Sequence, residues 1–249
     1  MDQYLAQADV ERPHGDLVGA IAPHAGHAYS GHVAAHAFKC ALGLEVETVA
    51  VISPSHYVDL APLLTTSHEA YSTPLGAIPV DRGALDQIGS SLPLLPVAHD
   101  PEHALEIELP FLQRALGAGS GFNLIPVMMR DQTPAVAEAL GHALAGALRD
   151  RKALLVASSD LSHFYPAHVA DALDANVLER IEAFDPGGVL AVEDEGKGFA
   201  CGRGAIAAVL WAARDLGATH AKVVKHATSG DVTGDYESVV GYGAAVIWR

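Results

Sequence analysis

The sequence predicts an α/β fold, a three-layer αβα sandwich around a mostly parallel, mixed sheet. Two observations support this prediction. Apolar segments of strand length alternate along the chain with segments of helical pattern, as βα units require. The strand-length segments are apolar on both faces, which is typical of strands that helices cover on each side. Because no fixed-period repeat or long linker divides the chain, we expect one domain over residues 1–249.

Six segments have the apolar content and the flanking turn residues of strands. They are Leu17–Ala22, Thr48–Ser53, Phe122–Met129, Ala153–Ser158, Ala221–Val224 and Ser238–Trp248. In sheets of this kind a ligand binds outside the carboxyl ends of the strands, because loops from neighbouring strands converge there. The loops after these strands are therefore where we expect a functional site.

Six other segments have helical periodicity. They are Gly31–Leu42, Arg82–Ser90, Glu102–Leu116, Pro134–Leu148, Ala167–Ala183 and Gly202–Leu216. In the third of them, leucines at positions 105, 109, 112 and 116 form one apolar stripe. We expect Pro110 to kink that helix, since proline removes a backbone hydrogen bond from a helix interior.

The composition narrows the class of protein. Half of the residues are hydrophobic and 18% are charged, which indicates a packed globular chain. The formal net charge of -15 argues against nucleic acid or an anionic membrane as a partner. The longest apolar run is too short to cross a bilayer, and with two cysteines and no secretion signal pattern we expect a cytoplasmic protein.

Several common catalytic motifs are missing from the sequence. It contains neither GxSxG nor GxxxxGK[ST], which disfavours the usual serine hydrolases and P-loop enzymes. The glycine-rich segment 117–121 follows a helical pattern and precedes a strand, the reverse of a dinucleotide-binding loop, so we expect a turn there.

Histidines follow three of the predicted strands. His24 lies in PHAG after the first strand, His56 in SPSHY after the second, and Asp160 and His163 in SSDLSH after the fourth. Any one of them alone is more simply a hydrogen-bonded loop residue. Together they bring three imidazoles and a carboxylate to one edge of the sheet, which favours a metal site.

A cysteine precedes the last predicted helix. In GFACGRG, residues 198–204, we expect Cys201 in the first turn of this helix, two residues from Arg203. Helix N–H groups and a neighbouring cation stabilise a thiolate, so Cys201 is a candidate metal ligand or nucleophile, although a small packing residue is equally consistent with the sequence. Cys40, within AAHAFKCAL, is expected to be a packing residue.

Two more segments carry polar side chains. At i and i+3 of the predicted helix, His103 and Glu106 share a face and are candidates to orient metal-bound histidines, or else belong to a solvated acidic turn. The loop over residues 226–236 holds Asp231 and Tyr236, and it is either a pocket wall or a plain surface loop.

These motifs make the sequence resemble the MEMO family, the homologues of the mediator of cell motility, and especially the prokaryotic AmmeMemoRadiSam system protein B. The matching segments span nearly the whole chain in the expected order. They are PHAG with YSG (23–31), PSH (54–56), EHALEIELPFL (102–112), SSDLSH (158–163), CGR (201–203), SGDVTGDY (229–236) and VVGYGA (239–244).

The resemblance implies an αβα fold similar to class III extradiol ring-cleaving dioxygenases. It also implies a metal site of His24, His56 and Cys201, with Asp160 and His163 lining the same pocket. In the related dioxygenases the third iron ligand is a carboxylate, which keeps Asp160 as the alternative to Cys201. The remaining candidates for substrate binding or for support of the metal ligands are Tyr29, His103, Glu106, Arg203, Asp231 and Tyr236.

Two imidazoles and one anionic ligand leave coordination positions open for chemistry. We expect a redox enzyme with non-haem iron, or else copper, in which His163 assisted by Asp160 acts as general acid and base on a small molecule. One alternative is a non-catalytic protein that binds a metal ion or a peptide, functionally linked to a radical-SAM protein. The other is a zinc-dependent hydrolase.

Overall fold

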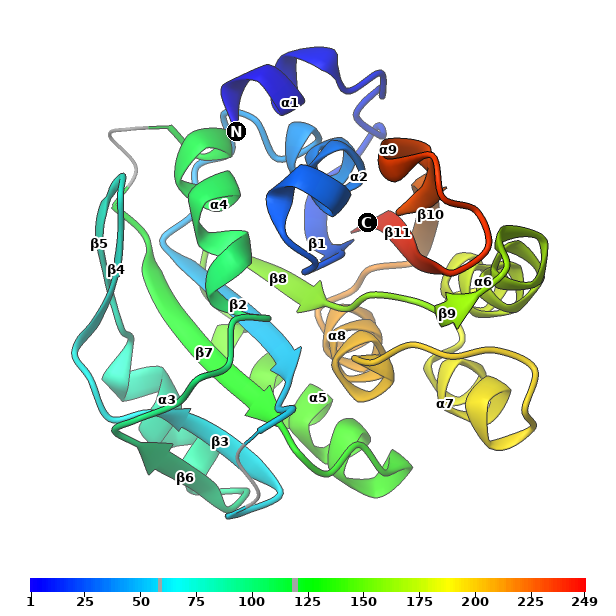
Figure 1. Ribbon diagram of the computed structural model, residues 1–249. Coiled ribbons are helices and arrows are strands. Elements are labelled where there is room, and N and C mark those ends of the chain that lie inside the picture. Colours follow the sequence, from blue (N-terminus) through cyan, green and yellow to red (C-terminus); the bar gives the residue numbers. More distant parts are fainter. Residues whose placement is uncertain (58–59, 118–120) are drawn as a thin grey trace.

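The computed structural model describes residues 1–57, 60–117 and 121–249. Most of the turn expected at 117–121 lies outside them. Within the described residues, nine strands form one sheet in the order β10-β11-β1-β8-β2-β7-β3-β6, with β9 paired to β11 (Figure 1). The strands are β1 (Leu17–Ala22), β2 (Thr48–Pro54), β3 (Leu63–Thr66), β6 (Leu94–Val97), β7 (Asn123–Met129), β8 (Ala153–Ser158), β9 (His163–Tyr165), β10 (His220–Thr228) and β11 (Val239–Trp248).

The centre of the sheet is parallel and its flanks are mixed. Strands β1, β8, β2 and β7 run parallel to one another, whereas β11 lies antiparallel to β1 and β3 antiparallel to β7. The central strands are buried along both faces, which explains their uninterrupted apolar sequences. The predicted mixed, mostly parallel sheet is confirmed.

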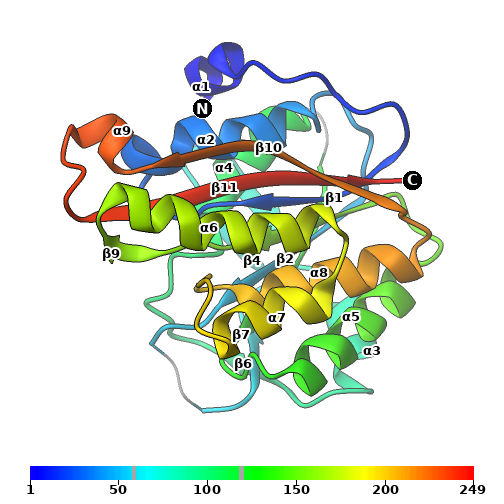
Figure 2. The ribbon, with the colours of Figure 1, turned by 90° about the vertical axis from the view of Figure 1, so that its right-hand side faces the viewer.

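Helices cover both faces of the sheet. They are α1 (Asp2–Gln7), α2 (His27–Lys39), α3 (Arg82–Gly89), α4 (Leu109–Ala115), α5 (Pro134–Leu148), α6 (Ala167–Glu182), α7 (Pro186–Asp194), α8 (Arg203–Asp215) and α9 (Gly230–Thr233). Figure 2 shows α1 and α2 on one side of the sheet and α5, α6 and α8 on the other. A separate core cluster fills each interface, which confirms the three-layer sandwich.

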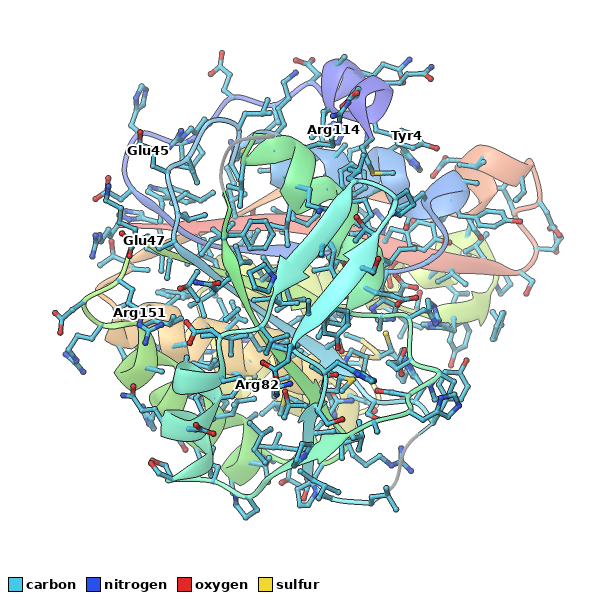
Figure 3. The ribbon with its side chains drawn as sticks, turned by 90° about the vertical axis from the view of Figure 1, so that its left-hand side faces the viewer. Tyr4, Glu45, Glu47, Arg82, Arg114 and Arg151 are labelled. Atoms are coloured by element: carbon cyan, nitrogen blue, oxygen red, sulfur yellow. The ribbon has the colours of Figure 1, made fainter. Side chains whose placement is uncertain are left out.

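A two-stranded hairpin, β4 (Ala70–Thr73) and β5 (Gly76–Pro79), lies beside α4 on the α2 side of the sheet. Thr73 Oγ1 donates to Gln113 Oε1 of α4 at 2.5 Å. Figure 3 shows the hairpin crossing the outside of the sheet and Arg114 reaching α1, where its Nε donates to Asp2 Oδ1 at 2.6 Å. None of the described helices is long and apolar enough to span a membrane.

The expected helix Glu102–Leu116 is wrong in its first half. A short 3₁₀ helix covers Glu106–Glu108 and the α-helix begins at Leu109, so Pro110 lies in its first turn and does not kink it. Proline costs little there, because the amides of the first turn have no intrahelical partner. Helix α2 begins at His27, four residues earlier than expected. Strands β3 to β6, β9 and helix α7 were not predicted.

Candidate metal centre

Three potential ligands meet where the central strands end. In Figure 1 the arrowheads of β2, β7 and β8 point toward the same side of the molecule. His24 follows β1 by two residues, His56 follows β2 by two, and Cys201 lies just before α8. One donor atom of each lies within 4.8 Å of the others. His24 Nε2 is 3.2 Å from Cys201 Sγ, and the two imidazole centroids are 5.6 Å apart.

His24 is buried and held from two directions. Its backbone N–H donates to Asp160 Oδ1 at 2.8 Å, and its Nδ1 lies 2.9 Å from Ser158 Oγ. Ser158 is the last residue of β8, the strand beside β1, and Asp160 follows it by two residues. With Nδ1 engaged by the serine, Nε2 is the ring nitrogen that faces Cys201 and is available to a metal ion.

Glu102 holds His56. The Oε2 atom of Glu102 accepts the backbone N–H of His56 at 2.6 Å and its Nδ1 at 2.9 Å. Burial alone would raise the pKa of the Glu102 carboxyl, but hydrogen bonds from His56 and Ala104 outweigh it and lower this pKa to about 2. The hydrogen bond with Glu102 in turn raises the pKa of His56. His56 Nε2 remains available as a ligand.

Cys201 is packed against the backbone after β8. Its Sγ accepts the N–H of Asp160 at 3.2 Å, and its own N–H donates to the carbonyl of Asp160 at 3.2 Å. Burial, reinforced by the charge of Asp160, raises the pKa of the thiol. The free site therefore holds a protonated thiol, whose proton a metal ion would displace.

The prediction that a helix N-terminus and Arg203 stabilise a Cys201 thiolate is wrong. Helix α8 begins at Arg203, so Cys201 lies outside its first turn. The guanidinium of Arg203 is engaged with two acidic residues that follow one another in α7, at 2.8 Å from Asp194 Oδ1 and 3.6 Å from Glu193 Oε2. Because α7 was not predicted, these competing partners of Arg203 were not apparent from the sequence.

Asp160 positions the turn that carries His24. Its Oδ1 accepts the amides of His24 and Ala25, at 2.8 and 3.2 Å. Among the described residues, the group that could hold a metal ion consists of His24, His56 and Cys201, without Asp160. The geometry therefore favours Cys201 over Asp160 as the anionic ligand.

The segment 102–108 orients both imidazoles, but through residues other than the expected pair. His103 is half exposed and its ring lies edge-on to that of His24 at 6.1 Å, while Glu106 is exposed and lines a separate cavity. The side chains that support the ligands are those of Glu102 and of Glu108, which hydrogen-bonds Ser158 at 2.8 Å. A helical spacing could not identify them, because residues 102–105 are not helical.

A cavity of about 820 Å³ opens onto the ligands. Its wall includes two of them, His56 and Cys201, together with Phe199 and Arg203. The remainder combines apolar residues with polar and charged ones: Leu60, Ala61, Pro62 and Ala200, and Arg130, Asp131, Gln132, Thr133 and Glu193. Three protein ligands beside an open cavity are the pattern of a catalytic metal site, whereas a structural site is closed.

His163 lies near this cavity with one nitrogen engaged. Its Nδ1 donates to the carbonyl of Leu161 at 2.7 Å, and its ring packs edge-on against Phe199 at 5.4 Å between centroids. Nε2 is therefore the ring nitrogen whose lone pair can accept a proton. The residue that orients His163 is Leu161, since the carboxylate of Asp160 is directed at the His24 turn.

Three further candidates lie off this cavity wall. Tyr29 is exposed in the first turn of α2. Asp231 accepts the N–H of Thr228 at 2.7 Å and lines another cavity, of about 530 Å³. The side chain of Tyr236 is exposed. Their proposed contact with substrate stays a prediction.

The donor set fits a metal ion. Both imidazoles have Nδ1 in a hydrogen bond, which is the arrangement that orients histidine ligands in metalloproteins. Imidazole and thiolate are ligands for iron, copper and zinc. His24 and His56 with Cys201 would hold the ion.

Comparisons with known proteins show which family the sequence resembles. A family model described as "Memo-like protein" matches residues 1–246. A MEMO1 family protein of Methanothermobacter thermautotrophicus is 39% identical over 232 residues, which cover 91% of this chain and 83% of that protein. Another, from Methanopyrus kandleri, is 36% identical over 239 residues, or 94% of this chain and 83% of that protein.

The fold also has a counterpart among solved structures. The crystal structure of an uncharacterized protein from Escherichia coli K12 matches with a TM-score of 0.50 and 15% sequence identity, over 92% of this chain and 99% of that chain. At this identity the likeness concerns the fold alone.

Proposed function

The chain belongs to the Memo-like protein family, and from this premise we propose that it is a metal-dependent oxidoreductase that acts on a small molecule in the cavity beside Cys201. One observation carries the proposal. Donor atoms of His24, His56 and Cys201, which come from three distant parts of the chain, lie within 4.8 Å of one another beside an open cavity.

Iron is the metal we propose first. Two imidazoles and one anionic group with open positions resemble the ligand set of non-haem iron oxygenases, except that a thiolate replaces the carboxylate. Copper also accepts imidazole and thiolate ligands. A bound redox metal would supply dioxygen activation, and the protein residues would position the substrate and move its protons.

His163 is the proposed general base. Its Nδ1 is committed to the carbonyl of Leu161, so Nε2 is the atom that would take a proton from a substrate hydroxyl. Phe199 lies against the His163 ring and also lines the cavity, and it offers an apolar face to a ring-shaped substrate. Catechols are the first substrates to test, since their cleavage by dioxygen keeps both oxygen atoms in the product and needs no other reductant.

The experiment has two stages. Elemental analysis of protein purified without a metal-affinity resin identifies the ion, and the Cys201→Ala variant shows whether it occupies this site. Anaerobic reconstitution with Fe(II), followed by an oxygen-uptake screen over catechols and related small molecules, then tests turnover. We expect uptake with Fe(II) that His163→Ala reduces. Iron binding without any turnover would contradict the enzyme and favour a binding protein, and activity with Zn(II) without oxygen would favour a hydrolase.

A further inference from the structure

Ser158 lies at the centre of a buried hydrogen-bonding cluster beneath His24. Its Oγ is 2.6 Å from the carbonyl oxygen of Ala104, 2.8 Å from Glu108 Oε1 and 2.9 Å from His24 Nδ1. Ser158 is fully buried and Glu108 is 1% exposed. Buried polar groups of this kind require a complete set of donors and acceptors.

The number of available protons determines which atom donates and which accepts in each hydrogen bond of the cluster. A serine hydroxyl has one proton to donate and two lone pairs that accept. The carbonyl of Ala104 can only accept, so it takes the serine proton in the shortest of the three bonds. Both remaining partners must then donate to Ser158 Oγ. Those donors are His24 Nδ1–H and a protonated carboxyl of Glu108.

The surroundings of Glu108 also favour the neutral form. Among the described residues, its hydrogen-bond partner is Ser158 and no cation acts on it, while the nearby charge is the negative one of Asp160. Burial, with Asp160, raises the pKa of Glu108 well above its ordinary value. Glu102, in contrast, has an imidazole and backbone amides around its carboxylate.

We infer that Glu108 is a neutral carboxylic acid in the folded protein and a positioning residue for His24: it donates to Ser158 Oγ, and this serine accepts from His24 Nδ1. The bond network holds the imidazole with Nε2 unprotonated and directed toward Cys201. The functional consequence rests on the proposed metal site, whereas the protonation state of Glu108 does not depend on it.

Infrared spectroscopy of the metal-free protein tests the protonation state. At neutral pH the difference spectrum between wild type and Glu108→Gln should contain the C=O stretch of one protonated carboxyl, present in the wild type. The ring nitrogen shifts of His24 in NMR spectra should show a proton on Nδ1 in both proteins, because the glutamine amide replaces the donor. A difference spectrum with a carboxylate band in place of the protonated one overturns the inference.

Binding of Co(II), a redox-stable probe, tests the positioning role. Glu108→Gln should keep the Co(II) dissociation constant within about threefold of wild type, while Glu108→Met, which has similar bulk and no donor, should weaken binding by about tenfold. A Glu108→Gln variant as weak as Glu108→Met contradicts the neutral donor. If wild-type protein binds no Co(II), the proposed metal site fails, and the infrared band still decides the state of Glu108.

Discussion

Cys201 supplies the anionic ligand of the proposed site. Replacing it by alanine leaves two imidazoles, and Asp160 is not free to substitute because its Oδ1 binds the amides of His24 and Ala25. We expect Cys201→Ala to retain less than about a tenth of the wild-type metal content after dialysis, as measured by elemental analysis. Circular dichroism should show an unchanged fold. Full occupancy in this variant would instead identify Asp160 as the ligand.

Substitution of Glu102 tests how strongly the groups around a metal ligand affect metal affinity. The carboxylate of Glu102 accepts both the backbone N–H and Nδ1 of His56, so the charge and the orientation of this imidazole depend on it. We expect Glu102→Gln to weaken Co(II) binding by about 10- to 100-fold in a titration. Glu69→Gln, at an exposed glutamate, is the matched control and should bind like wild type. Equal affinities in both variants would count against the role of Glu102.

A buried neutral glutamate has a defined effect on stability. With its pKa raised in the folded state, Glu108 keeps its proton at a pH where the unfolded chain has lost it, so its contribution to wild-type stability falls as pH rises above about 4.5. The slope is at most about 1.4 kcal/mol per pH unit from this one group. Glu108→Gln has no such proton, and we expect it to be more stable than wild type at pH 7.

Urea unfolding between pH 4 and pH 8 measures this difference. The greater free energy of unfolding of Glu108→Gln should disappear as pH falls toward 4.5, where the glutamate of the unfolded wild-type chain is protonated too. A variant that is less stable than wild type at pH 7 and shows no trend with pH would mean that Glu108 is ionised in the folded protein.

Among the helices and strands, sequence patterns predicted the segments whose structure depends on interactions between residues close in sequence. The central strands were predicted from apolar runs and flanking turns, and two of the three histidines expected to converge after them, His24 and His56, do meet. The start of the helix predicted over Glu102–Leu116 was wrong, because Glu102 Oε1 accepts the amides of His103 and Ala104 at 3.0 Å each. These local hydrogen bonds compete with helix formation, and the contacts of Glu102 with His56, which is remote in sequence, hold the side chain in place.

The protonation state of Cys201 could likewise not be predicted from the residues next to it in sequence. Its neighbour Arg203 is two positions away in sequence, but the guanidinium is engaged with α7. The thiol is surrounded by the chain after β8, more than 40 residues away in sequence. The identity of the ligand followed from a motif, whereas its protonation depends on contacts between remote segments.

The loop before α8 must approach β8 closely to bring the thiol to the imidazoles. A Cβ on Gly202 would lie 2.5 Å from the carbonyl oxygen of Ser158, so only glycine fits there. We expect Gly202→Ala to displace this loop and to weaken Co(II) binding by at least about tenfold, by the loss of one well-placed ligand.

Gly141→Ala is the control for a general packing defect. A Cβ there would lie 2.6 Å from Trp211 Cβ in the contact between α5 and α8, remote in sequence from all three ligands. This variant should lower the thermal midpoint and keep wild-type Co(II) affinity. If both glycine variants lose stability and neither loses affinity, the close approach at Gly202 does not matter for the site.

For the molecule as a whole, a metal ion would link segments that are remote in the chain. The ligands come from positions 24, 56 and 201, so an unfolded chain does not present them together. An ion that binds the folded form alone stabilises it by about 2.7 kcal/mol at a free concentration 100 times its dissociation constant. Thermal unfolding with and without Co(II) therefore reports on the whole site.

That stabilisation should depend on pH with a definite sign. Burial raises the pKa of the Cys201 thiol, so a metal ion must displace its proton, and affinity should rise about tenfold per pH unit from this group. The hydrogen bond with Glu102 raises the pKa of His56, so below that pKa a second proton must leave and the dependence should steepen.

The measurement is the Co(II)-induced shift of the thermal midpoint at several pH values, at one free metal concentration. We expect the shift to grow as pH rises and to shrink toward zero in acid, because protons compete with the ion for the same atoms. In Cys201→Ala, where any weak binding is left to His24 and His56, the dependence above the pKa of His56 should vanish. A wild-type shift that is independent of pH would mean that Cys201 is already a thiolate before the metal arrives.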